Sequence, residues 1–140
     1  MTSPDITQAP TFLGMVICDN VLQDPESRKY YILGTATVTF APSLPVRQQK
    51  LCVYAVLTDV RGKIRLRLRL VYVDPDSTED KEVMAIGGEV ESRDPLAVAE
   101  LAISLHNLVF PRAGEYRFQL WNDNSLLGER RYTVSLIQPK

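Results

Sequence analysis

Apolar and polar residues alternate along much of this chain, with the two-residue period that is typical of half-buried β-strands. The clearest example is GKIRLRLRLVYV, residues 62–73, in which isoleucine and leucine alternate with Arg65, Arg67 and Arg69. A strand over this segment buries its aliphatic face and turns the three arginines toward solvent. The pattern therefore predicts a strand, and it leaves open whether the arginine face grips an anion or is only solvated.

The same period recurs in neighbouring segments. YYILGTATVTF, residues 30–40, has threonines on one face and these apolar residues on the other: Tyr30, Ile32, Ala36, Val38 and Phe40. LCVYAVLT, residues 51–58, is apolar on both faces, which predicts a central strand or an outer face that another segment covers. KEVMAIGGEVES, residues 81–92, contains Gly87 and Gly88, which indicate a bulge or the close approach of another backbone.

The C-terminal segment predicts a hairpin, because two alternating stretches flank the turn residues NDNS at 122–125. The apolar positions of its two arms are Tyr116, Phe118 and Leu120, then Tyr132, Val134 and Leu136. We expect Tyr116 to pack in the core, with its hydroxyl donating to a backbone carbonyl.

The segment DPLAVAELAISLHNLVF, residues 94–110, fits two structures. Asp94 and Pro95 could begin a helix as its N-cap and first residue. The alternation of Leu101, Ile103 and Leu105 with polar residues fits a strand equally well. Because the rest of the chain has the strand pattern, we favour a strand over about 101–108, with one helical turn before it.

Seven or eight short strands separated by turn residues predict an all-β fold, a single-domain antiparallel β-sandwich of immunoglobulin-like or C2-like type. We place this domain at residues 12–137. Residues 1–11 contain two prolines and several small polar residues, which predicts a flexible N-terminal arm.

Pairing residues 62–73 with residues 81–92 gives a hairpin whose register can be predicted from the two faces. If Val73 pairs with Lys81, the inner pairs are Leu70–Met84, Leu68–Ile86 and Ile64–Val90, and the outer pairs are Arg69–Ala85, Arg67–Gly87, Arg65–Glu89 and Lys63–Glu91. A shift of two residues keeps the faces and brings Glu89 opposite Arg67, whereas a shift of one residue puts arginine in the core. In the favoured register Arg67 and Arg69 have no acidic partner.

Composition adds limits on location and partners. The 140 residues are 45% hydrophobic and 24% charged, and 16 basic against 17 acidic residues give a net charge of −1, so no global field attracts nucleic acid or anionic lipid. The start MTSPDITQAP has no signal-peptide pattern, and no 18-residue apolar run exists, so we expect a cytoplasmic protein without a membrane span. Cys18 and Cys52 lie outside any metal or redox spacing, which predicts two reduced, buried thiols.

Four motifs resemble a family of small, uncharacterised bacterial β-sandwich proteins of immunoglobulin-like or macroglobulin-like appearance. They are ICD at 17–19, YYILG at 30–34, LCVYAVLT at 51–58 and FPRAGEYRFQLW at 110–121, and the resemblance spans about residues 13–136. It implies a β-sandwich fold and a bacterial or phage-linked origin. It implies no activity.

The residues of catalytic chemistry are sparse. His106 is the only histidine, it lies in a predicted strand, and no nucleophile elbow, P-loop or dinucleotide fingerprint is present. The loop DPDSTEDKE is acidic but lacks the spacing of an EF-hand. A calcium site of the C2 type would have to gather Asp19, Asp24, Asp74, Asp76 and Asp123 at one end of the sandwich. We favour a solvated turn, and we expect no metal site, no cofactor and no enzymatic activity.

The arginine face has three interpretations. Residues two apart on a strand are about 6.6–6.8 Å apart, so Arg65, Arg67 and Arg69 form a line that could follow an anionic polymer. Single-strand binders add stacking aromatics, and none are interleaved here. Cross-strand carboxylates offset part of the charge, so we favour a solvated face over an anion site or a surface that binds a protein.

Two apolar features favour a protein partner. Trp121 has the outward parity of its strand, where an exposed tryptophan serves as an interface anchor, although it could instead cap the end of the core. The outer face of residues 51–58 forms an apolar patch if nothing covers it. The sequence thus predicts a non-catalytic interaction or accessory module that binds an unidentified protein or self-associates. The alternative is an electrostatic binder of nucleic acid or anionic lipid through Arg65, Arg67 and Arg69.

Overall fold

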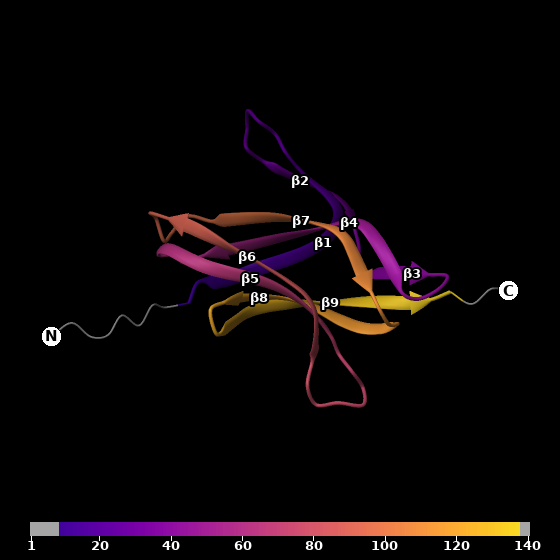
Figure 1. Cartoon of the computed structure of the whole chain (residues 1–140). Coiled ribbons are helices and arrows are strands. Elements are labelled where there is room, and N and C mark those ends of the chain that lie inside the picture. The colour runs from indigo at the N-terminus through magenta and orange to yellow at the C-terminus, as the bar shows by residue number, and fades with distance from the viewer. Residues whose placement is uncertain (1–8, 138–140) are drawn as a thin grey trace.

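The computed structural model describes residues 9–137, which form nine β-strands and no helix. The strands are β1 (Thr11–Gln23), β2 (Tyr30–Thr35), β3 (Val38–Ala41), β4 (Val46–Thr58), β5 (Gly62–Tyr72), β6 (Lys81–Ser92), β7 (Ala99–Phe110), β8 (Gly114–Asn122) and β9 (Ser125–Leu136). They pack as two sheets face to face, which confirms the predicted β-sandwich (Figure 1). Residues 1–8 of the predicted N-terminal arm lie outside the described residues. Residues 9–137 contain no helix long and apolar enough to cross a membrane.

The strand order is that of an immunoglobulin-type sandwich. One sheet has the order β2-β1-β4-β7 and the other β3-β9-β8-β5-β6, and all strand pairs are antiparallel except β3 with β9. In immunoglobulin domains strands A, B and E share one sheet, and strands G, F and C share the other. Here β1, β4 and β7 correspond to strands A, B and E, and β9, β8 and β5 correspond to strands G, F and C. β6 lies next to β5 at the edge of the second sheet. The order decides for the immunoglobulin-like form over the C2-like one.

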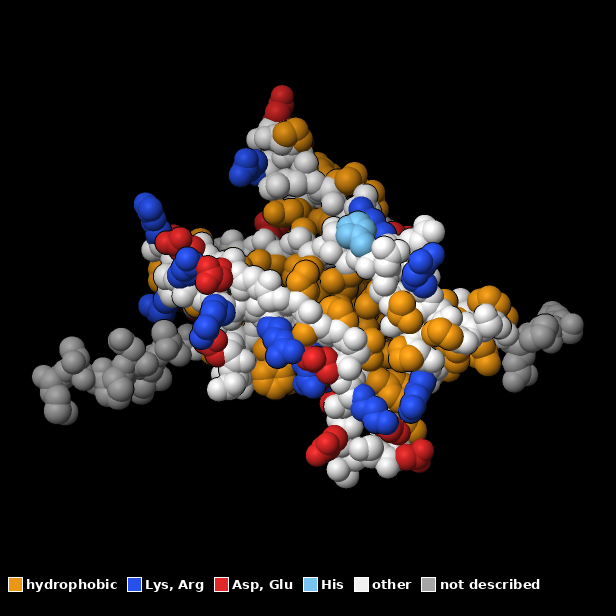
Figure 2. Space-filling model, in the orientation of Figure 1, with side chains coloured by type: hydrophobic (Ala, Val, Ile, Leu, Met, Phe, Trp, Pro, Cys, Tyr) orange, Lys and Arg blue, Asp and Glu red, His pale blue; other side chains and the backbone are white. Residues whose placement is uncertain are grey.

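One strand of that plan is absent from the described residues. In immunoglobulin domains strand D pairs with the outer edge of strand E. Here residues 93–98 lead directly from β6 to β7, and β7 pairs only with β4. As a result β6 and β7 are the edge strands on one side of the sandwich, and Figure 2 shows hydrophobic side chains at the surface in this region.

The prediction of one continuous strand over residues 30–40 is wrong, and this error is one reason why seven or eight strands were predicted where the structure has nine. The chain crosses from one sheet to the other between Thr35 and Val38, so β2 and β3 are separate strands. The crossing interrupts the alternation, because Phe40 is 63% exposed whereas Thr39 is buried and its Oγ1 lies 2.6 Å from the Tyr132 hydroxyl. The break at residues 36–37 is therefore enough to turn Phe40 from the inner face to the outer face.

The strand predicted for residues 101–108 is confirmed and is longer, as β7. The helical turn predicted before it is wrong. Asp94 instead initiates a tight turn, with its side chain accepting a hydrogen bond from the Leu96 N–H at 3.0 Å and its carbonyl accepting one from the Ala97 N–H at 3.0 Å. The side chain that could have capped a helix therefore caps a turn.

The predicted register of the β5–β6 hairpin is confirmed for the pairs from Lys63–Glu91 to Leu70–Met84. The last predicted pair is wrong, because Lys81 pairs with Tyr72 and not with Val73. Between Leu70 and Val71 the register shifts by one residue, which leaves Val83 as the extra residue of a bulge in β6.

The core lies between the sheets, and β4 is central in its sheet, as its two apolar faces predicted. Cys18 of β1 and Cys52 of β4 are directly opposite each other in that sheet, and both are buried and free, as expected. Burial, together with the nearby Cys52 and Asp19, raises the pKa of the Cys18 thiol. These thiols are structural parts of the packed sheet.

Aromatic side chains dominate the other half of the core. The ring of Phe110 lies 5.1 Å from that of Tyr116 and 5.6 Å from that of Tyr132. The Tyr116 hydroxyl donates to the Arg112 carbonyl at 2.6 Å and accepts from the Arg112 N–H at 3.1 Å. This confirms the predicted role of Tyr116 and forms the tyrosine corner that immunoglobulin-type domains have at the start of strand F.

Candidate interaction surfaces

The arginines of β5 lie on the outer face of the five-stranded sheet, and each has an acidic partner. Arg65 pairs with Asp123 of the β8–β9 turn at 3.2 Å. Arg67 and Arg69 both pair with Glu82, at 2.7 and 2.9 Å. The line of charge that the alternation predicted is therefore present, but its charges are partnered within the chain.

The prediction that Arg67 and Arg69 lack an acidic partner is wrong, and the bulge in β6 is the reason. Strict alternation puts Glu82 on the same face as the inward-facing Met84. The extra residue Val83 reverses this, and Glu82 lies opposite Val71 on the outer face. The partner expected for Arg65, Glu89, pairs instead with Lys63 at 3.0 Å.

Trp121 lies beside these arginines, as its outward parity predicted. It is directly opposite Arg67 in the β5–β8 pair and is half-buried. Its Nε1 donates to Oε1 of Gln119 on the same face at 3.0 Å, so it does not cap the end of the core. Trp121, Arg67, Arg69 and Glu82 share one shallow, mostly polar hollow of about 410 Å³.

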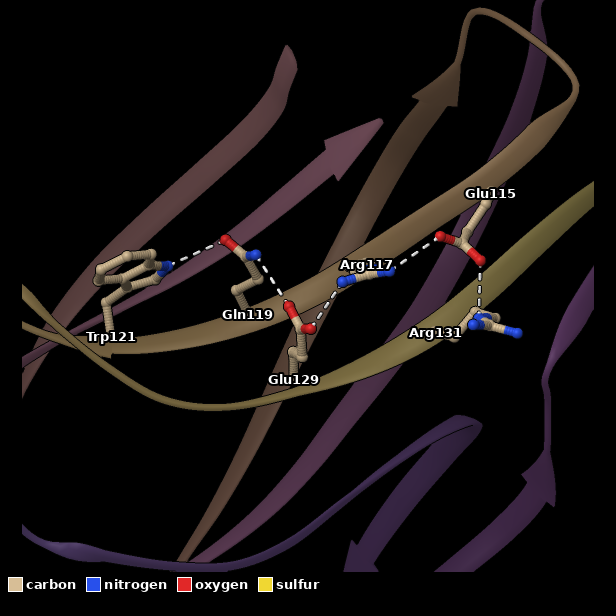
Figure 3. A network of polar contacts seen from close by, with 6 residues as sticks. All are labelled: Glu115, Arg117, Gln119, Trp121, Glu129 and Arg131. Atoms are coloured by element: carbon tan, nitrogen blue, oxygen red, sulfur yellow. Dashed lines mark hydrogen bonds and ion pairs between the residues drawn. The ribbon is translucent and has the colours of Figure 1, made fainter. Parts of the chain in front are cut away.

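The contact between Trp121 and Gln119 begins a chain of polar contacts across β8 and β9 (Figure 3). The Gln119 Nε2 donates to Glu129, which also accepts from Arg117, both at 2.9 Å. Arg117 and Arg131 in turn contact Glu115, at 3.2 and 2.7 Å. The charge of Glu129 and the bond to Glu115 raise the pKa of Arg117 further, so this guanidinium remains charged. The charged side chains of this face are thus already paired with one another, and a charged ligand would have to displace these contacts.

The candidate catalytic and metal residues do not converge. Within residues 9–137, no group of three or more His, Cys, Asp and Glu side chains is placed to hold a metal ion. Asp24 and Asp74 each accept hydrogen bonds from backbone N–H groups of their own turns, which lowers the pKa of both carboxyl groups. His106 is exposed on β7.

A second surface lies on the open side of the sandwich, between the edge strands β6 and β7. It contains two adjoining hollows, of about 560 and about 370 Å³, which share Ile86 and Ser104. Their lining is mostly apolar and includes Val83, Met84, Ile86 and Val90 of β6, Leu101, Ile103 and Leu105 of β7, and the core residues Leu66, Leu68 and Leu120. We call this the edge groove. It follows both strands and opens to solvent.

The two glycines of β6 line the edge groove. The bulge predicted at Gly87 and Gly88 is wrong, because the irregularity lies at Val83. A Cβ atom at Gly88 would have no heavy atom within 4 Å, and one at Gly87 would meet only the Leu66 carbonyl oxygen, at 3.7 Å. Within the described chain, then, no other backbone makes the close approach that the glycine pair suggested.

Comparison with known proteins places the chain in a family. A family model matches residues 13–135. The chain belongs to this family of unknown function (DUF6941). The match agrees with the resemblance carried by the four motifs, and it adds no activity. No protein with a curated description matches the sequence.

Three solved structures are similar at low identity. An immunoglobulin-like protein from Pseudomonas aeruginosa is 18% identical with a TM-score of 0.43, and the match covers 92% of this chain and 98% of that one. A β-glucosidase from Kluyveromyces marxianus is 14% identical, with a TM-score of 0.45, and one from Erythrobacter marinus is 16% identical, with a TM-score of 0.39. The matches cover 75% and 70% of this chain but only 15% and 14% of the glucosidases. At these TM-scores we base the fold on the strand order alone.

In this member of the DUF6941 family, sequence patterns located the arginine face but missed Glu82 and the edge groove. Glu82 changes face at a bulge that alternation does not reveal. The edge groove had two weak signals, which were the paired glycines and the short link from Ser92 to Ala99 that leaves no room for another strand. Neither signal shows by itself that two strands lack neighbours.

Proposed function

We propose that this protein is a non-catalytic interaction module that binds a partner protein along the edge groove by strand addition. In strand addition, an extended segment of the partner pairs with an exposed sheet edge, and its alternate side chains enter apolar pockets. The observation that carries the proposal is the pair of long edge strands with an apolar groove between them.

The backbone of the edge strands supports the proposal. β6 and β7 have 12 residues each, and every second residue of an edge strand turns its N–H and C=O groups away from its neighbour. Soluble proteins usually protect such edges with lysine, proline, a bulge or an inward-facing charge. β6 has a bulge at Val83, whereas β7 has no lysine, arginine or proline in its sequence.

The side chains around the edge groove support it as well. Ile86 is 44% exposed, and Leu101 and Ile103 are partly buried against the core. An extended segment lying between the two strands would cover these side chains and remove apolar surface from water. The arginine face offers less, because all four cations of β5 are ion-paired.

Site-specific photo-crosslinking tests the proposal. A photoreactive amino acid replaces Ile86 or Ile103 in cells that make the protein, and Phe40 of β3 and Leu33 of β2 serve as exposed apolar controls away from the groove. We expect protein adducts from both groove positions and none from the control positions. Adducts only from the controls, or none at all, would refute strand addition at the edge groove.

A further inference from the structure

We infer that the partner at the edge groove is a second copy of this chain, bound through β7. Two β7 strands would pair antiparallel about a two-fold axis at Ile103 and join the two four-stranded sheets into one. This inference rests on the proposed function and names its partner. Such a contact uses the same surface on both copies, so every complementary pair occurs twice.

The regular part of β7, residues 99–106, favours it over β6 as the pairing edge. There the partners in β4 follow one register with no shift, and the first irregular residue of β7 is Asn107, whose φ is 56°. In β6 the bulge at Val83 would interrupt a new ladder. The edge of β7 is also the place that strand D covers in immunoglobulin domains.

Charge complementarity fixes the position of the axis. With the axis at Ile103, Glu100 of each copy lies opposite His106 of the other. Lys50 pairs with His106 in the β4–β7 register, so its ammonium group is the cation beside that contact. An axis at Ala102 or Ser104 would put Glu100 opposite Ser104 or Leu108 and lose the contact. All three side chains are exposed in the single chain.

The apolar residues at the two ends of β7 also match in this arrangement. Leu96 and Val98, just before β7, are 85% and 57% exposed, and Val109 near its end is 44% exposed. Antiparallel pairing about Ile103 brings residues 96–98 of one copy beside residues 108–110 of the other. On the groove side, Leu101 of each copy lies opposite Leu105 of the other, so apolar side chains meet apolar side chains.

Sedimentation equilibrium of the full chain tests the inference, with a charge exchange as the decisive step. Glu100→Lys puts a cation beside Lys50 of the other copy, and His106→Glu puts two carboxylates opposite each other, so we expect each to raise the dimer dissociation constant by about fivefold to thirtyfold. Mixing the two variants gives opposite charges at one contact and keeps the wild-type pair at the other. The mixture should therefore dimerise at least as well as the wild-type protein, which also shows that both variants are folded.

A matched pair of edge variants locates the contact. Ile103→Lys should abolish the dimer, and Leu33→Lys, on the opposite edge strand β2 of the same sheet, should leave it intact. A protein that stays monomeric at about 1 mM, a dimer that neither charge variant weakens, or a dimer lost only with Leu33→Lys would each overturn the inference. If the wild-type chain is monomeric but Ile103 crosslinks to a different protein in cells, the proposed function stands and this inference fails.

Discussion

Removing the hydroxyl of Tyr116 is a direct test of the corner that connects the two sheets. Tyr116→Phe keeps the fully buried ring and deletes both hydrogen bonds with the Arg112 backbone. A buried polar group left without a partner costs about 1–3 kcal/mol. The Arg112 groups are only partly buried, so water can replace some of the loss, and we expect the free energy of unfolding to fall by about 2 kcal/mol.

Urea unfolding followed by the fluorescence of Trp121, the only tryptophan, measures this change. With a slope of about 1–3 kcal/mol per molar urea, the unfolding midpoint should fall by about 1 M. Tyr31→Phe is the matched control, because Tyr31 is 51% exposed and the loss of its hydroxyl should change stability by less than about 0.5 kcal/mol. If the two variants unfold at the same urea concentration, the hydrogen bonds of the Tyr116 hydroxyl do not stabilise the fold.

Three further predictions concern the ion pairs of Glu82, the ionisation of Tyr54 and the two buried thiols. Glu82→Gln removes the shared carboxylate of two arginines, so the variant should be retained on heparin at low salt where the wild-type protein is not; equal retention would contradict the role of this ion pair. Burial, together with the hydrogen bond that its hydroxyl donates to Glu100, raises the pKa of Tyr54 to about 12. As the pH rises above about 10, the tyrosine of the unfolded chain therefore ionises before that of the folded chain, and the stability of the wild-type protein should fall. Tyr54→Phe should lack this part of the loss in urea unfolding at high pH, and identical pH profiles would refute the assignment. Cys18 and Cys52 should react with a thiol reagent only when the chain unfolds, and rapid labelling of the native protein would show that the sheet does not bury them.

Alternation determined the parts of the fold in which one face of a strand is buried without interruption. The β5–β6 register followed from the sequence because a slip of one residue would put arginine in the core. The central place of β4 and the packing of Tyr116 followed from the same cause, which is the cost of leaving large apolar side chains in water.

Alternation failed wherever the backbone departed from a regular strand. The crossing at residues 36–37 reversed the face of Phe40, and the bulge at Val83 reversed that of Glu82. A single extra residue changes which way a side chain points, and nothing in the side-chain pattern requires that residue to be there.

The sequence by itself determined that this chain forms a β-sandwich, which apolar residues of β5 and β8 lie in the core, and which strand carries the arginines. Only the tertiary structure decided that those arginines are paired and that β6 and β7 have no outer neighbours among residues 9–137. The physical reason is that side-chain alternation records burial along one strand. The neighbours of a strand depend on how distant segments assemble, and the open edge of β7 is a property of that assembly.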